Sequence, residues 1–189
     1  NKHAHGYQDL TNVLMNSCTL GMSLMAMGVP RYQTCGSLRQ FGFGSKTDVE
    51  LAGEENGLIQ DPEQWIGTVP ANNFIGQGIA VTQMQMVMAI ASIANGGALL
   101  KPYIIDEVRD SAGKLLHKGS RRVKYQVMSR QTAAFLRSAM KMVVSEGGGK
   151  GAKSEKVLIA GKTGTAQVAS GGLYSKGHYV ASFPGFWPA

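Results

Sequence analysis

The chain has 189 residues, of which 43% are hydrophobic and 16% are charged, a balance that excludes an intrinsically disordered protein and predicts one globular domain or most of one. Its formal net charge of +7 favours anionic partners, but the basic clusters carry no interleaved aromatic side chains, which argues against a nucleic-acid-binding surface. No apolar run reaches the roughly 18 to 20 residues that a membrane-spanning helix needs.

The first part of the chain predicts two helices separated by a break. Apolar residues recur at helical spacing on both sides of Ser17-Cys18-Thr19, and small hydroxyl residues favour turns and helix caps over helix interiors. We therefore expect a helix, a break at residues 17–19 and a second helix. A short helix over residues 32–40 and a long loop over residues 45–73 follow. Cys18 and Cys35 lack metal-ligand spacing and are expected to be small buried residues.

Two longer helices are predicted in the middle of the chain. The first runs from Thr82 to Asn95, because Thr82 and Gln85 have the spacing of a capping box and an apolar stripe follows them. The second begins after Ser129, which is expected to cap it, and runs to about Ser145.

Extended chain is predicted in two regions. The first is a hairpin, with its arms at residues 98–108 and 114–117. The second begins at residues 157–160, continues through residues 161–166, turns at Gly171-Gly172 and returns over residues 178–183. Helices and hairpins follow one another without βαβ alternation, so we expect a mixed α+β fold rather than a doubly wound one.

The strongest chemical signal is Lys162-Thr163-Gly164-Thr165. On a strand, Lys162 and Gly164 would share one face, while Thr163 and Thr165 would share the other. One ammonium and two hydroxyls at the edge of a strand can hold a carboxylate. Because Gly164 has no side chain, a substrate backbone can lie close beside the strand.

A series of segments in fixed order extends this signal along nearly the whole chain. These segments are Phe41-Gly42-Phe43-Gly44, Ile75-Gly76-Gln77-Gly78-Ile79, Val81-Thr82-Gln83-Met84-Gln85, Ala91-Ser92-Ile93-Ala94-Asn95-Gly96-Gly97, Ala160-Gly161-Lys162-Thr163-Gly164-Thr165-Ala166-Gln167 and Tyr179-Val180-Ala181-Ser182-Phe183. Together they resemble the transpeptidase domain of class B, high-molecular-weight penicillin-binding proteins.

The resemblance implies an α+β fold of the penicillin-binding protein and serine β-lactamase type, with an antiparallel sheet flanked by helices. Residues 1–189 would form the C-terminal part of a transpeptidase domain, without its extreme C-terminal end. The implied activity is that of a peptidoglycan D,D-transpeptidase, which cross-links stem peptides through a serine acyl-enzyme, is the target of β-lactams and uses no cofactor or metal. Expected partners are the D-alanyl-D-alanine stem peptide, β-lactam antibiotics and other cell-wall synthesis or division proteins, with no nucleic acid. The expected location is the bacterial cell envelope, at the outer, periplasmic face of the cytoplasmic membrane, where a segment upstream of this chain would anchor the protein.

The resemblance also implies a role for each site residue. Lys162, Thr163 and Thr165 would bind the substrate carboxylate, with Gly164 between them, and the backbone N–H of Thr165 would supply half of an oxyanion hole. Ser17 matches the first residue of the Ser-x-Asn motif of the family and would help to move a proton to the leaving amine. Thr19 holds the third, substrate-binding position of that motif, where the family has asparagine.

The nucleophile motif Ser-x-x-Lys does not precede Ser17 in this chain. Two matches occur elsewhere, beginning at Ser111 and Ser138, but both follow Ser17 and are therefore in the wrong order for the family. We expect the nucleophile to lie in an upstream segment, because the chain opens abruptly in polar sequence at Asn1. Ser17 is then expected to have no base of its own within these 189 residues.

Two alternatives remain from the sequence. Because Thr19 departs from the motif, one alternative is a non-catalytic relative that uses the same fold to bind a partner or a cell-wall fragment. Gly161-Lys162-Thr163 after an apolar segment also imitates the end of a P-loop, but Lys156 occupies the position of the glycine that a P-loop requires. No role is assigned to His178, which has no acidic or histidine neighbour at useful spacing.

Overall fold

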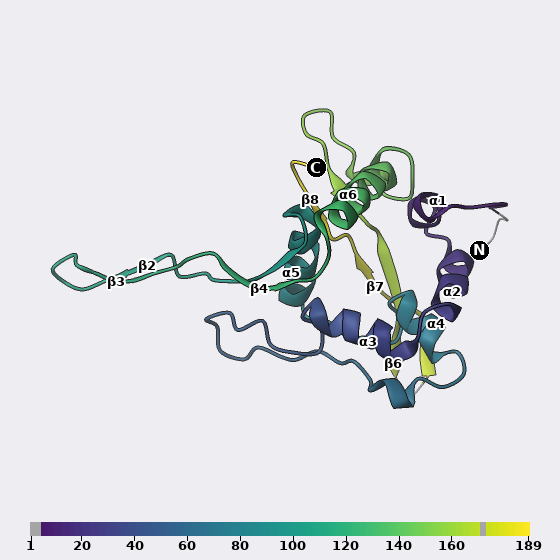
Figure 1. Ribbon diagram of the computed structural model, residues 1–189, viewed down its shortest axis with the longest axis horizontal. Helices are drawn as coiled ribbons and strands as arrows, with labels where there is room; N and C mark the ends of the chain where they lie inside the picture. The colour runs from purple at the N-terminus through teal and green to yellow at the C-terminus, as the bar shows by residue number, and fades with distance from the viewer. Residues whose placement is uncertain (1–4, 171–172) are drawn as a thin grey trace.

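The computed structural model describes residues 5–170 and 173–189, which form a body of helices with two extended ribbons (Figure 1). The helices are α1 (Leu10–Met15), α2 (Thr19–Met27), α3 (Arg31–Gln40), α4 (Val69–Phe74), α5 (Gln83–Ala94) and α6 (Arg130–Ser145), with short 3-10 turns η1 (Pro62–Gln64) and η2 (Lys150–Ala152). The strands are β1 (Ala98–Lys101), β2 (Glu107–Arg109), β3 (Leu115–Lys118), β4 (Arg122–Gln126), β5 (Ala160–Gly161), β6 (Gly164–Ser170), β7 (Leu173–Ser182) and β8 (Gly185–Phe186). Among these described residues, no helix has the length and apolar character to cross a bilayer.

The break predicted between the first two helices is present, at slightly different residues. Asp9 caps α1 by accepting a hydrogen bond from the Asn12 N–H at 2.8 Å. Thr19 does not belong to the break, because it is the first residue of α2, and the cap is Cys18. The predicted helix over residues 32–40 is confirmed as α3.

The predicted loop over residues 45–73 is wrong in its second half, where η1 and α4 lie. Helix α4 has 6 residues, too few for an apolar periodicity to emerge from the sequence. It packs against α2.

Helices α5 and α6 confirm the sequence prediction closely. The capping box of Thr82 and Gln85 is formed, and Ser129 caps α6 by accepting a hydrogen bond from the Thr132 N–H at 3.0 Å. The two helices contact each other, α5 contacts β1, and α6 contacts β5. Cys18 and Cys35 are buried as expected, and the other buried hydrophobic residues come from every part of the body: Val13, Ala26, Val49, Trp65, Ala89, Ala98, Leu99, Ala133, Ala139, Met140, Val143, Val144 and Ala160.

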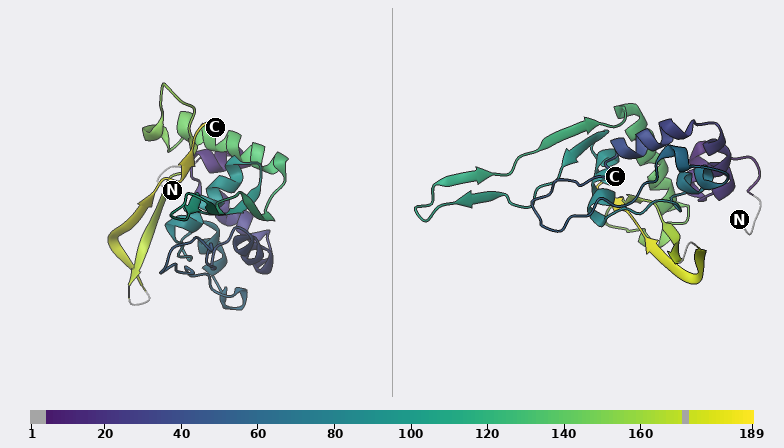
Figure 2. Two further views of the ribbon diagram at one scale, coloured as in Figure 1. Left: turned by 90° about the vertical axis from the view of Figure 1, so that its left-hand side faces the viewer. Right: turned by 90° about the horizontal axis from the view of Figure 1, so that it is seen from below.

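The first ribbon is a long arm that projects away from the helices (Figures 1 and 2). Its tip is the predicted hairpin, in which β2 pairs antiparallel with β3. Its base, however, pairs β1 with β4, a strand that the sequence does not predict. The side chains of β4 are mostly exposed, so no buried face produces an alternation of apolar and polar residues.

The second ribbon carries the residues of chemical interest and lies along one side of the helices (Figure 2, left). Strand β5 pairs with β8 and β6 with β7, all antiparallel, and the register Gly161↔Gly185 continues unchanged as Gly164↔Ser182. The predicted strand over residues 157–160 is reduced to the short β5. The predicted turn at Gly171-Gly172 lies outside the described residues.

Candidate active site

Ser17 lies in the turn between α1 and α2, and the backbone of this turn is tightly held. The Ser17 N–H donates to the Leu14 carbonyl at 3.3 Å, and Ser17 adopts φ of 50°, in the left-handed region that non-glycine residues rarely occupy. The buried Cys18 thiol accepts from the Gly21 N–H at 3.4 Å. On the other side, the Gly148 N–H donates to the Met15 carbonyl at 3.4 Å, so the turn packs against the glycine segment after α6.

Lys162 reaches Ser17 from the second ribbon. It lies between β5 and β6, where its backbone N–H donates to the Pro184 carbonyl at 3.1 Å. Its ammonium Nζ donates to the Ser17 Oγ at 2.5 Å and to the Thr163 carbonyl at 3.1 Å. Two residues that are 145 positions apart in the sequence thus form one polar centre.

The environment of Lys162 changes its acidity. The side chain is half-buried, and burial lowers the pKa of its ammonium from the ordinary value of 10.5, because the charged form loses solvation. Ser17 does have a hydrogen-bond partner in this chain, because the Lys162 ammonium donates to its hydroxyl, but this partner is not the base that Ser17 was expected to lack. As an ammonium, Lys162 is a proton donor to Ser17 rather than a base.

The two threonines differ in exposure. Thr163 is half-buried with Gly148 beside it, since a Cβ placed on Gly148 would lie 3.6 Å from the Thr163 Oγ1. Thr165 is exposed on β6. Lys162 and Thr163 fall in the gap between β5 and β6, so of the four-residue motif that they begin only Gly164 and Thr165 lie within β6.

The remaining candidate residues are Gly164 and Thr19. A Cβ on Gly164 would lie 2.6 Å from the Ser182 Oγ, so a larger residue here would force the side chain of its cross-strand partner on β7 to move. Thr19 is exposed at the start of α2. In the described residues, no hydrogen bond joins it to Lys162, Thr163 or Thr165.

One edge of β6 is covered by β7, and in the part of the chain that the structure describes no strand pairs with the other edge. The backbone groups of an antiparallel strand point alternately to its two edges. The Lys162 N–H faces the β8 side, so the N–H groups of Gly164 and Ala166 face β7. The N–H groups of Thr163 and Thr165 therefore face the open edge. The Thr165 N–H is therefore directed away from β7.

The other candidates from the sequence do not join this centre. Ser138 is exposed on α6, and Ser111 lies at the turn of the arm. Lys162 is followed by strand β6, whereas a P-loop lysine opens a helix, and His178 is exposed on β7. Within residues 5–170 and 173–189, no three His, Cys, Asp or Glu side chains gather closely enough to hold a metal ion.

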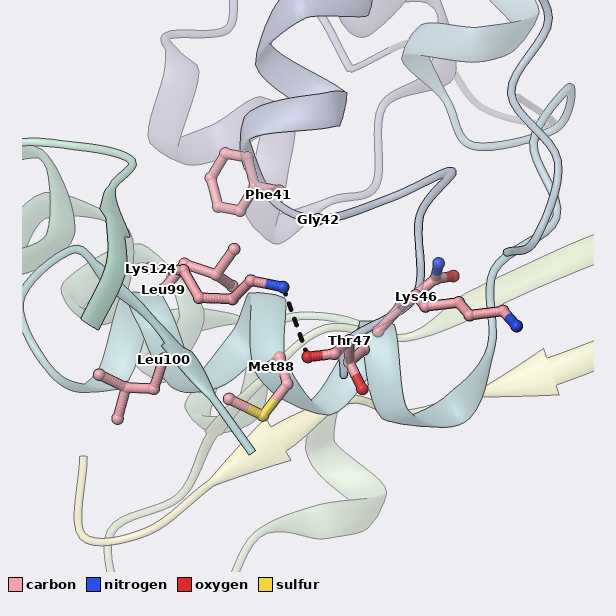
Figure 3. Close-up of a pocket in the computed structure, with 9 residues that line it drawn as sticks. Phe41, Gly42, Lys46, Thr47, Met88, Leu99, Leu100 and Lys124 are labelled. Atoms are coloured by element: carbon pink, nitrogen blue, oxygen red, sulfur yellow. Dashed lines mark hydrogen bonds between the residues drawn. The ribbon is translucent and has the colours of Figure 1, made fainter. Parts of the chain in front are cut away.

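A small pocket lies elsewhere, between the loop after α3, helix α5 and strands β1 and β4 (Figure 3). It is lined largely by apolar atoms, and Lys124 closes it by donating from Nζ to the Thr47 carbonyl at 3.4 Å. None of the candidate site residues lines this pocket, so it lies apart from the Ser17–Lys162 centre.

Comparisons with known proteins identify the family of the chain. The family model described as the penicillin binding protein transpeptidase domain matches residues 1–189. The chain is 38% identical over 187 residues to stage V sporulation protein D of Bacillus subtilis, covering 98% of this chain and 29% of that protein. It is 35% identical over 188 residues to the penicillin-binding protein PbpB of Mycolicibacterium smegmatis, covering 95% of this chain and 29% of that protein.

Solved structures give the same result. A crystal structure of penicillin binding protein 3 from Mycobacterium tuberculosis complexed with ampicillin matches with a TM-score of 0.85 and 34% identity, covering 93% of this chain and 41% of that one. The transpeptidase domain of penicillin-binding protein 3 from Burkholderia pseudomallei matches with a TM-score of 0.87 and 25% identity, covering 100% of this chain and 54% of that one.

The expected α+β fold is thereby confirmed. The chain spans about 29% of the length of the Bacillus and Mycolicibacterium relatives. From the match over its whole length and from its fold, the chain belongs to the penicillin-binding protein transpeptidase family, with class B proteins as its relatives.

Proposed function

We propose that the protein containing this chain is a peptidoglycan D,D-transpeptidase that cross-links stem peptides and is acylated by β-lactams. The single observation that carries this proposal is the 2.5 Å hydrogen bond from the Lys162 Nζ to the Ser17 Oγ, beside the open edge of β6. Relatives named as peptidoglycan D,D-transpeptidases support the activity. A relative of the same fold that binds ampicillin supports the ligand class.

In this proposal the donor peptide lies along the open edge of β6. Its terminal carboxylate is held by the Lys162 ammonium and the hydroxyls of Thr163 and Thr165, because charge-assisted hydrogen bonds are stronger than neutral ones. Its reacting carbonyl oxygen lies against the Thr165 N–H, which stabilises the negative charge that develops there. Gly164 leaves the strand without a side chain at this point. Thr19 is proposed to contact the donor from the start of α2, although a hydroxyl has a shorter reach than asparagine.

The chemical step requires a serine nucleophile, which we propose lies in the upstream segment together with its lysine. The serine oxygen forms a bond to the donor carbonyl carbon as its proton passes to that lysine, the peptide bond to the last alanine breaks, and the leaving amine takes up a proton. Ser17 delivers that proton and is reprotonated by Lys162. An acceptor amine of a second stem peptide then displaces the serine and completes the cross-link.

The proposed location and further partners follow from the same family. We infer that the intact protein is anchored in the bacterial cell envelope and acts at the outer face of the cytoplasmic membrane, where peptidoglycan is assembled. Cell-wall synthesis or division proteins are its proposed protein partners. Relatives named for sporulation and for peptidoglycan transpeptidation support this placement.

The proposal is tested by Lys162→Ala in the intact protein. Hydrogen bonds to charged groups contribute about 1.5–3 kcal/mol, so acylation by a labelled penicillin should slow by about 10- to 150-fold. The control is Lys156→Ala, which removes an exposed lysine six residues earlier and should change nothing. Unchanged acylation of the Lys162 variant would contradict its role in binding the carboxylate.

The second candidate, a non-catalytic binding module, is favoured by a single feature, the threonine at position 19. It predicts that the intact protein binds a β-lactam or a muropeptide reversibly and forms no covalent adduct. An upstream sequence without a Ser-x-x-Lys motif would decide for this candidate.

A further inference from the structure

A residue that the proposed mechanism does not use contacts the same open edge of β6. The side-chain Nε2 of Gln77 donates to the Gln167 carbonyl at 3.0 Å, and its Oε1 accepts from the Gln167 N–H at 3.4 Å. The two residues are 90 positions apart. One amide side chain therefore occupies both main-chain hydrogen-bonding groups of Gln167, as a paired strand would.

The loop after α4 holds Gln77 in place through its own backbone. The Gln77 N–H donates to the Asn72 carbonyl at 2.9 Å, and the Gly76 N–H donates to the Asn73 carbonyl at 3.1 Å. This is a Schellman motif, in which Gly76 takes the left-handed position with φ of 80°. A Cβ on Gly78 would lie 1.9 Å from the Asn73 Oδ1, so a second glycine is needed directly after Gln77.

The backbone groups of β6 point alternately to its two edges, and this alternation fixes where the Gln77–Gln167 contact lies relative to Thr165. Thr165 and Gln167 both direct their backbone N–H and C=O to the open edge, because they are two residues apart. Two residues of a strand span about 7 Å. The hydrogen-bonding position that follows Thr165 along the open edge is therefore the one that Gln77 fills.

We propose that Gln77 is a specificity-determining residue that closes the open edge of β6 one pairing position beyond Thr165. This inference rests on the proposed function, in which an extended peptide lies along that edge with its carboxyl end at Lys162. Such a peptide runs antiparallel to β6, so its earlier residues extend toward Gln167. It pairs with Thr165, and the residue two positions earlier meets Gln77 instead of free backbone groups.

Gln77 therefore confines main-chain recognition to the last residues of the donor. The enzyme gains no affinity from the backbone of the earlier stem residues, and the earlier part of the stem peptide is free to leave the strand edge. Removing the side chain should open a second pairing position at Gln167, and a longer extended ligand should then form up to two more hydrogen bonds.

The test compares acylation of the intact protein by two penicillins with the same ring. One carries a short acyl side chain, and the other extends that side chain by an extended dipeptide. In Gln77→Ala, the rate with the long penicillin divided by the rate with the short one should rise about tenfold over the unmodified protein, because each hydrogen bond contributes about 0.5–1.5 kcal/mol. Gln77→Asn, whose side chain is one methylene shorter, should also raise the ratio. It serves as a second variant in case the alanine variant folds poorly.

Two control variants complete the experiment. Gln77→Glu keeps the size of the side chain and can still accept from the Gln167 N–H, but it cannot donate to the Gln167 carbonyl, so its ratio should rise less than that of Gln77→Ala. Gln83→Ala removes an exposed glutamine at the start of α5 and should leave the ratio unchanged. If Gln77→Ala and Gln77→Asn slow both penicillins equally, Gln77 only stiffens β6 and the proposal is overturned. If the unmodified protein is acylated by neither penicillin, the proposed function itself is overturned.

Discussion

At the scale of single residues, the contact between Ser17 and Lys162 combines a strained backbone with a buried charge. Ser17 holds φ of 50°, and the left-handed region costs a non-glycine residue about 1–2 kcal/mol. Glycine would avoid this cost, but it has no hydroxyl to accept the hydrogen bond of Lys162. The presence of serine at a position that suits glycine indicates that the hydroxyl matters more than the local backbone energy.

Stability and chemistry at Ser17 can be separated with two variants. Ser17→Gly and Ser17→Ala both remove the hydroxyl, but only glycine relieves the left-handed backbone. We expect Ser17→Gly to be more stable than Ser17→Ala by about 1 kcal/mol in thermal denaturation. Both should slow the acylation of the intact protein by at least about tenfold, because they remove a proton-transfer group. Normal acylation of the more stable glycine variant would show that the hydroxyl is dispensable.

The lowered pKa of Lys162 predicts a pH dependence with a definite sign. A lysine whose pKa lies below 10.5 loses its positive charge at a lower pH than an exposed lysine. Acylation should therefore decline as pH rises, with a midpoint below 10.5. Lys162→Arg should remove this decline, because a guanidinium stays protonated throughout the accessible range. A midpoint at or above 10.5 would contradict the effect of burial.

The same shift affects the stability of the fold. Between the lowered pKa and 10.5, the unfolded chain binds a proton that the folded chain has already released. The free energy of unfolding should consequently rise with pH in that interval, so the buried ammonium is a cost that the fold bears at neutral pH. Lys162→Met should lose this rise, which thermal denaturation at several pH values would detect.

At the scale of elements, helix α5 is joined to the long loop by one buried side chain. The Gln85 Oε1 accepts from the Thr82 N–H at 2.8 Å and completes the capping box. Its Nε2 donates to the carbonyls of Ser45 and Asn56, each at 2.8 Å. Gln85 is only 1% exposed, so no water can replace these partners without opening the loop.

Gln85→Leu is expected to destabilise the fold by about 2–4 kcal/mol, since it leaves two carbonyls and one N–H without partners in a buried site. The matched control is Gln83→Ala on the exposed side of the same helix turn, with an expected change within about 0.5 kcal/mol. Thermal denaturation of the intact protein measures both. Equal effects of the two variants would mean that Gln85 does not hold the loop.

At the scale of the whole molecule, this chain carries only part of the proposed machinery. It corresponds to 41% of the solved Mycobacterium tuberculosis chain and 54% of the solved Burkholderia pseudomallei chain. Several large apolar side chains of α2 are exposed, including Leu20 at 64%, Leu24 at 60% and Met27 at 82%. Within the 189 residues, no Ser-x-x-Lys motif precedes Ser17.

The isolated chain is therefore expected to form no covalent adduct with a labelled penicillin in mass spectrometry. Acylation needs a hydroxyl beside a group that takes its proton, whereas the Lys162 ammonium donates a hydrogen bond to Ser17. Ser138 is exposed on α6, and in the described residues no hydrogen bond joins it to Lys141. A stoichiometric adduct at Ser17 or Ser138 would overturn the proposal that the nucleophile lies upstream. Restoring the upstream segment should restore labelling.

The sequence by itself determined those helices whose formation depends on residues close together in the chain. Helices α5 and α6 were predictable because caps and apolar spacing act within a few residues, as at Thr82, Gln85 and Ser129. The family was predictable because its motifs are short and occur in a fixed order. Helix α4 and strand β4 were not, since one is short and the other has no buried face.

Only the tertiary structure decided which of these residues meet. The hydrogen bond of Lys162 to Ser17 joins positions 145 apart, and that of Gln77 to Gln167 joins positions 90 apart. A contact between distant segments leaves no periodicity in either one, so no local pattern could have revealed it. The motif resemblance predicted that Ser17 and Lys162 belong to one site, but not that they share a hydrogen bond, and Gln77 appeared only within a matching segment. The turn between α1 and α2 brings Ser17 to Lys162, and the loop after α4 brings Gln77 to β6, because the packing of the helices against the second ribbon sets these distances whatever the separation in sequence.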